Sequence, residues 1–86
     1  MKLIITIIPQ KDSNPVSQAL TEKIFRVTKI ASTGGFLRKG NATMLVGVDD
    51  DKLDEAISLI KNNVTSSETG RNGVLFVVKV DKFIHF

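Results

Sequence analysis

The apolar run at the start of the chain constrains the fold most. Residues 2–8 read Lys-Leu-Ile-Ile-Thr-Ile-Ile, so β-branched side chains occupy both alternating sets of positions. This pattern is typical of a strand that is buried on both faces and therefore central in its sheet. We expect no secretory leader, because the apolar run has only about six residues and no small-residue cleavage site follows it.

A helix is predicted next, over residues 15–25. Ser13 and Asn14 are capping residues, and Pro15 would occupy the first helical position, where its missing N–H does no harm. The apolar face of this helix repeats at helical spacing. Its members are Val16, Ala19, Leu20 and Ile24.

Two strands follow, at 27–31 and 42–48. The connection between them is short and rich in glycine, which makes the pair antiparallel, since parallel strands need a longer crossover. Gly47 lies inside the second strand and indicates a bulge or a close approach by another group.

Three aspartates at 49–51 precede a second amphipathic helix that ends near residues 62–63. We interpret these carboxylates as capping and stabilising the helix N-terminus. A calcium loop would also need alternating ligands, a central glycine and a closing glutamate. A polar loop at 65–73 and a buried strand at 74–80 complete the chain.

The predicted order is therefore β-α-β-β-α-β in one domain, residues 1–86. Two right-handed crossovers onto one sheet give an α+β ferredoxin-like sandwich, with a four-stranded antiparallel sheet and both helices on one face. The other face is apolar and needs a cover. The chain has no cysteine to brace so small a core, so packing against other subunits is the simplest solution.

Charge and hydropathy argue against two kinds of partner, nucleic-acid polymers and membranes. Twelve basic residues against nine acidic ones give a net charge of +3, too small an excess to indicate binding to a nucleic-acid polymer. No apolar stretch approaches the roughly 18 residues needed to cross a membrane. We expect a soluble, cytoplasmic protein.

The segment 23–39 concentrates the binding chemistry. It contains five basic side chains and no acidic one, together with hydroxyls, the Gly34-Gly35 pair and the aromatic Phe36. Cations and exposed backbone N–H groups suit phosphate, and an aromatic ring suits a base. A plain turn would also explain the glycines. Both readings remain open from composition alone.

Catalytic and metal-binding patterns are not found. His85 is the single histidine, and no phosphate loop or dinucleotide fingerprint is present. Acylphosphatases of this topology use an arginine and an asparagine, which Arg26 and Asn41 would supply, but their arginine follows the first strand. An RNA-recognition domain would carry aromatics in its central strands, and residues 1–8 contain none. We expect a protein that is not an enzyme, with no metal and no cofactor.

Several segments closely resemble the PII-like cyclic-di-AMP receptors of Gram-positive bacteria. The resemblance spans residues 1–64 and resumes at 73–86, and its motifs occur in the family's order and spacing. They read Phe-Arg-Val-Thr-Lys at 25–29, Ser-Thr-Gly-Gly-Phe-Leu at 32–37, Gly-Asn-Ala-Thr at 40–43 and Gly-Val-Asp-Asp at 47–50.

The resemblance implies a homotrimer that holds cyclic-di-AMP in clefts between subunits and catalyses nothing. Arg26 and Thr28 would contact the polar and phosphate groups of the ligand. Gly47 would permit its close approach. Ligand binding would then alter flexible loops and the binding of a further, unidentified protein.

The remaining site residues follow from the same resemblance. Gly35, Phe36 and Leu37 would enclose an adenine, Asn41 would hydrogen-bond a base edge, and Phe76 would add an apolar wall. One departure is that family members carry a longer insertion where this chain has only a short link at about 65–73. The alternative within the same superfamily is a PII-type sensor of ATP and 2-oxoglutarate.

Overall fold

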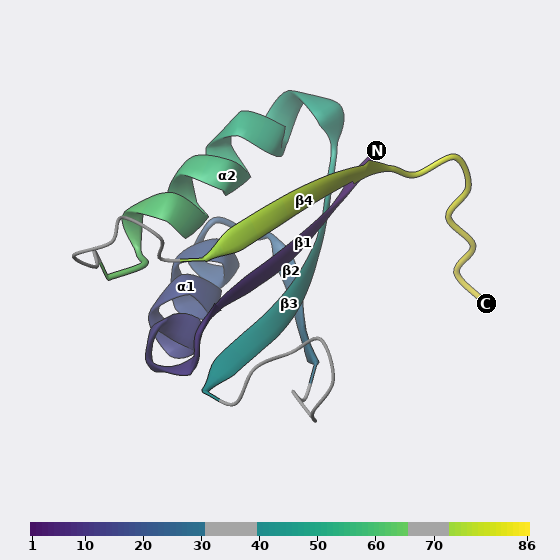
Figure 1. Cartoon of the computed structure of the whole chain (residues 1–86). Coiled ribbons are helices and arrows are strands. Elements are labelled where there is room, and N and C mark those ends of the chain that lie inside the picture. Colours follow the sequence, from purple (N-terminus) through teal and green to yellow (C-terminus); the bar gives the residue numbers. More distant parts are fainter. Residues whose placement is uncertain (31–39, 66–72) are drawn as a thin grey trace.

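The predicted element order is confirmed. The computed structural model describes residues 1–30, 40–65 and 73–86. The sheet order is β2-β3-β1-β4, every neighbouring pair is antiparallel, and both helices lie on one side of the sheet (Figure 1). The fold is therefore ferredoxin-like. Its elements are β1 (Lys2–Pro9), α1 (Gln10–Glu22), β2 (Arg26–Ile30), β3 (Asn41–Val48), the short 3-10 turn η1 (Asp50–Lys52), α2 (Leu53–Asn62) and β4 (Val74–Lys79).

β1 is central, as its apolar run predicts, with β3 on one side and β4 on the other. Ile4 and Ile8 are almost fully buried on the helix-covered face. Thr6, the one polar side chain inside the run, donates a hydrogen bond from Oγ1 to the carbonyl of Val74 at 2.9 Å. The core beneath the helices consists of Ile4, Ile8, Val16, Leu20, Met44, Val46, Val48, Ala56 and Ile60.

The predicted start of α1 is wrong. The helix begins at Gln10, and Pro15 lies inside it. The Gln10 N–H donates to the Gly40 carbonyl at 2.7 Å, which ties the first turn to the start of β3. Asp12, buried in that turn, accepts a hydrogen bond from Thr65 Oγ1 at 2.6 Å. These tertiary contacts start the helix ahead of the proline, despite the hydrogen bond that the proline removes.

The predicted end of α1 is also wrong, and Ile24 does not belong to its apolar face. The helix ends at Glu22. Ile24 follows with a φ of 68°, and its side chain is 91% exposed. The Phe25 N–H donates to the Leu20 carbonyl and the Ile24 N–H to the Thr21 carbonyl, a Schellman end that normally favours glycine at the left-handed position.

We expect Ile24→Gly to raise the free energy of unfolding by about 1 kcal/mol, because a β-branched residue is strained at positive φ and glycine is not. Urea unfolding followed by circular dichroism, at one fixed protein concentration, measures the change. Ile24→Ala is the matched control: it removes the side chain but keeps the Cβ responsible for the strain. An equal gain from both variants would contradict the explanation.

Two further expectations need correction. β4 is predicted to be buried, but it is an edge strand in which Val74, Phe76, Val77 and Val78 are between 41% and 50% exposed. Its apolar residues have too few partners within one chain. The aspartates at 49–51 make no side-chain capping hydrogen bond to η1 or α2, and Asp50 pairs instead with the Met1 amino group.

Gly73 lies where the chain enters β4 against the backbone of β1. A Cβ at this position would stand 2.7 Å from the Ile7 carbonyl oxygen. This oxygen belongs to the backbone, so it cannot rotate away as the end of a side chain can. We expect Gly73→Ala to lower the free energy of unfolding by about 1–3 kcal/mol through overpacking. Gly47→Ala is the control in the same urea titration, since its Cβ would meet only the tip of the Met1 side chain. Equal stability of the two variants would refute this account.

Candidate functional site

Three of the predicted site residues share one end of the sheet face that the helices leave uncovered. Strand pairing sets Arg26 opposite Gly47, and Thr28 lies two residues further along β2 on the same face. β2 is an edge strand, so Arg26 and Thr28 are both exposed. A cation, a hydroxyl and an open backbone position therefore lie together in the described structure.

These residues line a hollow of about 790 Å³. It lies where the start of β1, the end of β3 and the turn between α1 and β2 meet. Its basic lining residues outnumber its acidic ones, which suits an anionic ligand. The side chains that carry charge are Lys2, Lys23, Arg26 and Lys52 on the basic side and Asp49 and Glu55 on the acidic side.

Gly47 is open to the hollow because it lacks a side chain. No bulge interrupts β3 at this position, since its pairing with β1 is continuous along both strands. Instead, Met1 approaches it: a Cβ on Gly47 would stand 3.2 Å from the terminal methyl carbon of Met1. Another group therefore approaches Gly47 closely, as the glycine predicts, and that group is the Met1 side chain.

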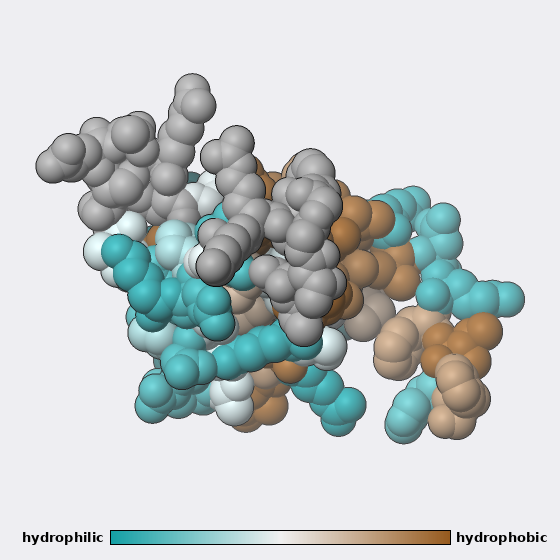
Figure 2. Space-filling view, turned by 60° about the horizontal axis from the view of Figure 1, so that its bottom comes forward, coloured by the Kyte–Doolittle hydropathy of each residue, from teal (hydrophilic) through white to brown (hydrophobic). Residues whose placement is uncertain are grey.

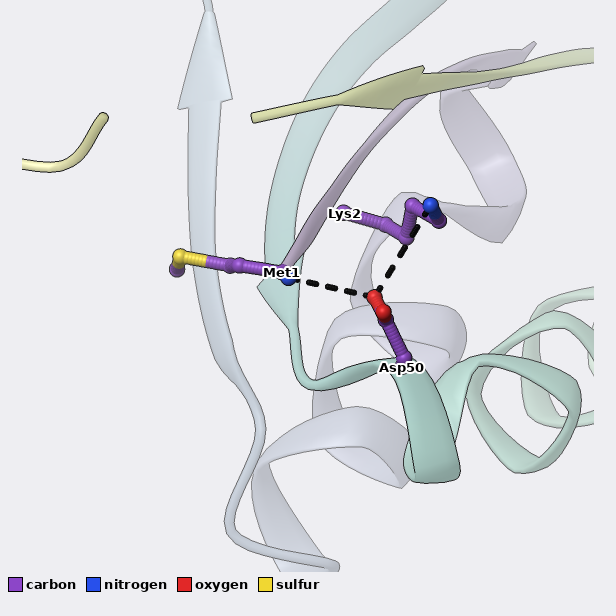
Figure 3. Close-up of polar contacts among 3 residues, drawn as sticks. All are labelled: Met1, Lys2 and Asp50. Carbon is purple, nitrogen blue, oxygen red and sulfur yellow. Dashed lines mark ion pairs between the residues drawn. The ribbon is translucent and has the colours of Figure 1, made fainter. Parts of the chain in front are cut away.

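An exposed ion-pair cluster lies at the start of the chain, beside Met1. Its amino group lies 3.1 Å from Asp50 Oδ1, and Lys2 Nζ lies 3.9 Å from the same oxygen (Figure 3). The hydrogen bond from the amino group, followed by the charge of Lys2, lowers the pKa of Asp50 below its ordinary value. The Met1 side chain points away from this cluster. The cluster lies at the start of β1, next to the hollow.

The other predicted residues lie elsewhere or outside the described structure. Phe76 is on β4, across the sheet from Thr28 in the same row of paired residues, which places it about 14 Å away at three strand spacings. Asn41 starts β3 and lies about 20 Å from Gly47 along the strand. It lines a separate, smaller hollow with Lys29 and Asn14. Gly35, Phe36 and Leu37 fall outside the described residues.

Sequence reasoning missed three residues that line the main hollow, Met1, Ile24 and Phe83. They come from the start of the chain, the turn after α1 and the segment after β4, so no local motif joins them. The exposure of aromatic residues near the C-terminus is a signal that only the structure gives. In Figure 2, apolar residues gather on the side of the molecule that faces this C-terminal segment.

Within the described residues, no group of three or more acidic, histidine or cysteine side chains is placed to hold a metal ion. No described helix is both long and apolar enough to span a bilayer. The hollow is lined by lysine, arginine and hydroxyl groups, which can donate to an anion, and also by the carboxylates of Asp49 and Glu55, which cannot.

Comparison with known proteins supports the fold and identifies the family. The crystal structure of a functionally unknown protein from Pediococcus pentosaceus ATCC 25745 is similar, with a TM-score of 0.80 and 29% sequence identity over 99% of this chain and 96% of that one. The family model described as cyclic-di-AMP receptor matches residues 1–70, which include Arg26, Thr28 and Gly47. The chain therefore belongs to the cyclic-di-AMP receptor family.

Proposed function

We propose that the chain binds cyclic-di-AMP as a non-catalytic receptor, in a cleft formed by two copies of itself. The main observation in support of this proposal is that Arg26, Thr28 and Gly47 line one hollow on the uncovered sheet face. The Arg26 guanidinium presents a fork of donors that matches phosphate oxygens. Thr28 adds a hydroxyl donor, and Gly47 lets the ligand approach the backbone.

The need for a second copy follows from where Phe76 lies. Phe76 and Arg26 are on opposite edge strands of the same sheet, which lie three strand spacings or about 14 Å apart. A neighbour that presents its β4 edge to the β2 edge of this chain brings them together. The resemblance to PII-like receptors assigns Asn41 and the segment 35–37 to the same site, but Asn41 starts β3 about 20 Å from Gly47 and lines a separate hollow. The proposal therefore rests on Arg26, Thr28 and Gly47.

A homotrimer is the proposed assembly, on the resemblance to PII-like receptors. The uncovered sheet face supports association, since Leu3, Ile5 and Leu45 are only half buried there, and Phe76 and Val78 remain 49% and 44% exposed. Covering such a face between subunits stabilises each by about 25 cal/mol per Å² of apolar area.

The proposed output is a change in the binding of another protein in the cytoplasm, and no reaction of the ligand. Family membership supports a binding role, and the described hollow has no nucleophile paired with a base. Cyclic-di-AMP would shift the population of loop conformations next to the site, and the partner would read that shift.

Isothermal titration calorimetry tests the ligand. We expect saturable heat with cyclic-di-AMP, and much weaker or no binding with cyclic-di-GMP and with ATP, with or without 2-oxoglutarate. Equal affinity for all the nucleotides, or no heat with cyclic-di-AMP, would overturn the proposal. Tight binding only of ATP with 2-oxoglutarate would favour a PII-type sensor.

A further inference from the structure

The C-terminal segment leaves the sheet directly beside the hollow. The last ladder contact is the Val80 N–H, which donates to the Met1 carbonyl at 3.1 Å. Residues 81–86 then extend away from the strands and the helices (Figure 1). Phe83, 69% exposed, lines the hollow together with Arg26, whereas Phe86 is fully exposed and lines no described hollow.

Phe83 is one of three large apolar side chains on the rim of the hollow. Met1 is 43% exposed, Ile24 is 91% exposed, and both line the same space as Phe83. None of them takes part in the core. A lone exposed apolar residue needs no explanation, but three of them from separate segments around one cationic hollow form an apolar wall.

The cationic and apolar side chains around the hollow together indicate which chemical groups a ligand there would carry. Arg26 and Thr28 donate to an anion, and an aromatic ring with aliphatic neighbours contacts a flat apolar ring. A purine joined to a phosphate has both features. Bases stack well on exposed phenylalanine rings, because the contact needs only a π-face and a position close to the phosphate-binding cation.

We propose that Phe83 stacks on one adenine of cyclic-di-AMP, with Ile24 and Met1 at its edges. This inference rests on the proposed function and adds to it a contact from outside the 1–70 match to the family model. Cyclic-di-AMP contains two adenines, and this contact accounts for one of them.

The test is a calorimetric titration of cyclic-di-AMP into Phe83→Ala, with Phe86→Ala as the matched control. We expect Phe83→Ala to weaken binding about 5- to 150-fold, the range for losing one base–aromatic stack. Phe86→Ala should bind like the unchanged chain, and Phe83→Tyr should restore affinity to within about threefold, since its ring is retained. Because Phe83 is mostly exposed, the variants should melt at the temperature of the unchanged chain.

The outcomes separate the two proposals. No binding by the unchanged chain overturns the proposed function and this inference with it. Binding by the unchanged chain with an unaltered Phe83→Ala affinity, or an equal loss in Phe86→Ala, overturns only the role of Phe83.

Fluorescence gives an independent readout. The chain contains no tryptophan, so Phe83→Trp introduces a single reporter. Cyclic-di-AMP should quench its emission through stacking, and the emission of Phe86→Trp should not respond. A quench of equal size in both variants would contradict a specific contact at Phe83.

Discussion

Arg26→Ala is expected to weaken cyclic-di-AMP binding about 10- to 150-fold, the effect of losing hydrogen bonds from a charged donor. Arg26 is exposed on an edge strand and takes no part in the core, so the variant should fold with an unchanged melting temperature. Calorimetric titration gives the dissociation constant. Arg26→Lys should recover only part of the affinity, because lysine keeps the charge but lacks the planar fork.

Lys29→Ala is the matched control for Arg26. Lys29 is a second cation on β2, but it faces Asn14, whose Oδ1 accepts a hydrogen bond from its Nζ at 2.7 Å. Removing it lowers the local positive charge to the same extent without touching the hollow. Should both variants lose affinity equally, net charge and not a directed contact would explain binding.

Val78→Lys is expected to convert the proposed trimer into monomers. Val78 belongs to the uncovered sheet face, where a lysine is tolerated in a single chain but becomes an unpaired buried charge between subunits. Such a charge should weaken association by on the order of 100-fold or more. Light scattering coupled to size-exclusion chromatography measures the mass. Because the proposed cleft needs two copies, cyclic-di-AMP binding should fall with the trimer.

Val77→Lys provides the control on the next residue. Val77 is 41% exposed and Val78 is 44% exposed, but they point to opposite faces of β4. Val77→Lys adds the same charge to the same strand on the helix side and should leave the mass unchanged. A monomeric unchanged chain, or dissociation of both variants, would overturn the proposed interface.

Sequence patterns predict correctly those helices and strands that are determined by residues close together in the chain. The apolar run at the start of the chain indicates a central strand, and the short link between β2 and β3 requires antiparallel pairing. The start of α1 predicted from Pro15 is wrong because helix capping is a local signal. The contacts that set the true start, of Gln10 with Gly40 and of Asp12 with Thr65, join residues far apart in the chain. Helix boundaries set by such contacts are not visible in a local pattern.

The site residues also differ in whether a sequence motif or only the fold identifies them. Arg26, Thr28 and Gly47 were identified because a family motif carries them on two paired strands. Met1, Ile24 and Phe83 belong to three separate segments, and only the folded chain places them around one hollow. β4 is less buried than its apolar sequence predicts for another reason: it is an edge strand, so a neighbouring strand covers only one of its sides.

The placement of Arg26 and Phe76 on opposite edges of the sheet has a consequence for stoichiometry. In a closed ring of identical subunits, each chain would give its β2 edge to one site and its β4 edge to the next, so sites and chains are equal in number. A chain damaged at Arg26 still offers an intact Phe76 to its neighbour, and the reverse also holds. Mixed assemblies of two such defective chains would therefore contain complete sites that neither chain forms alone.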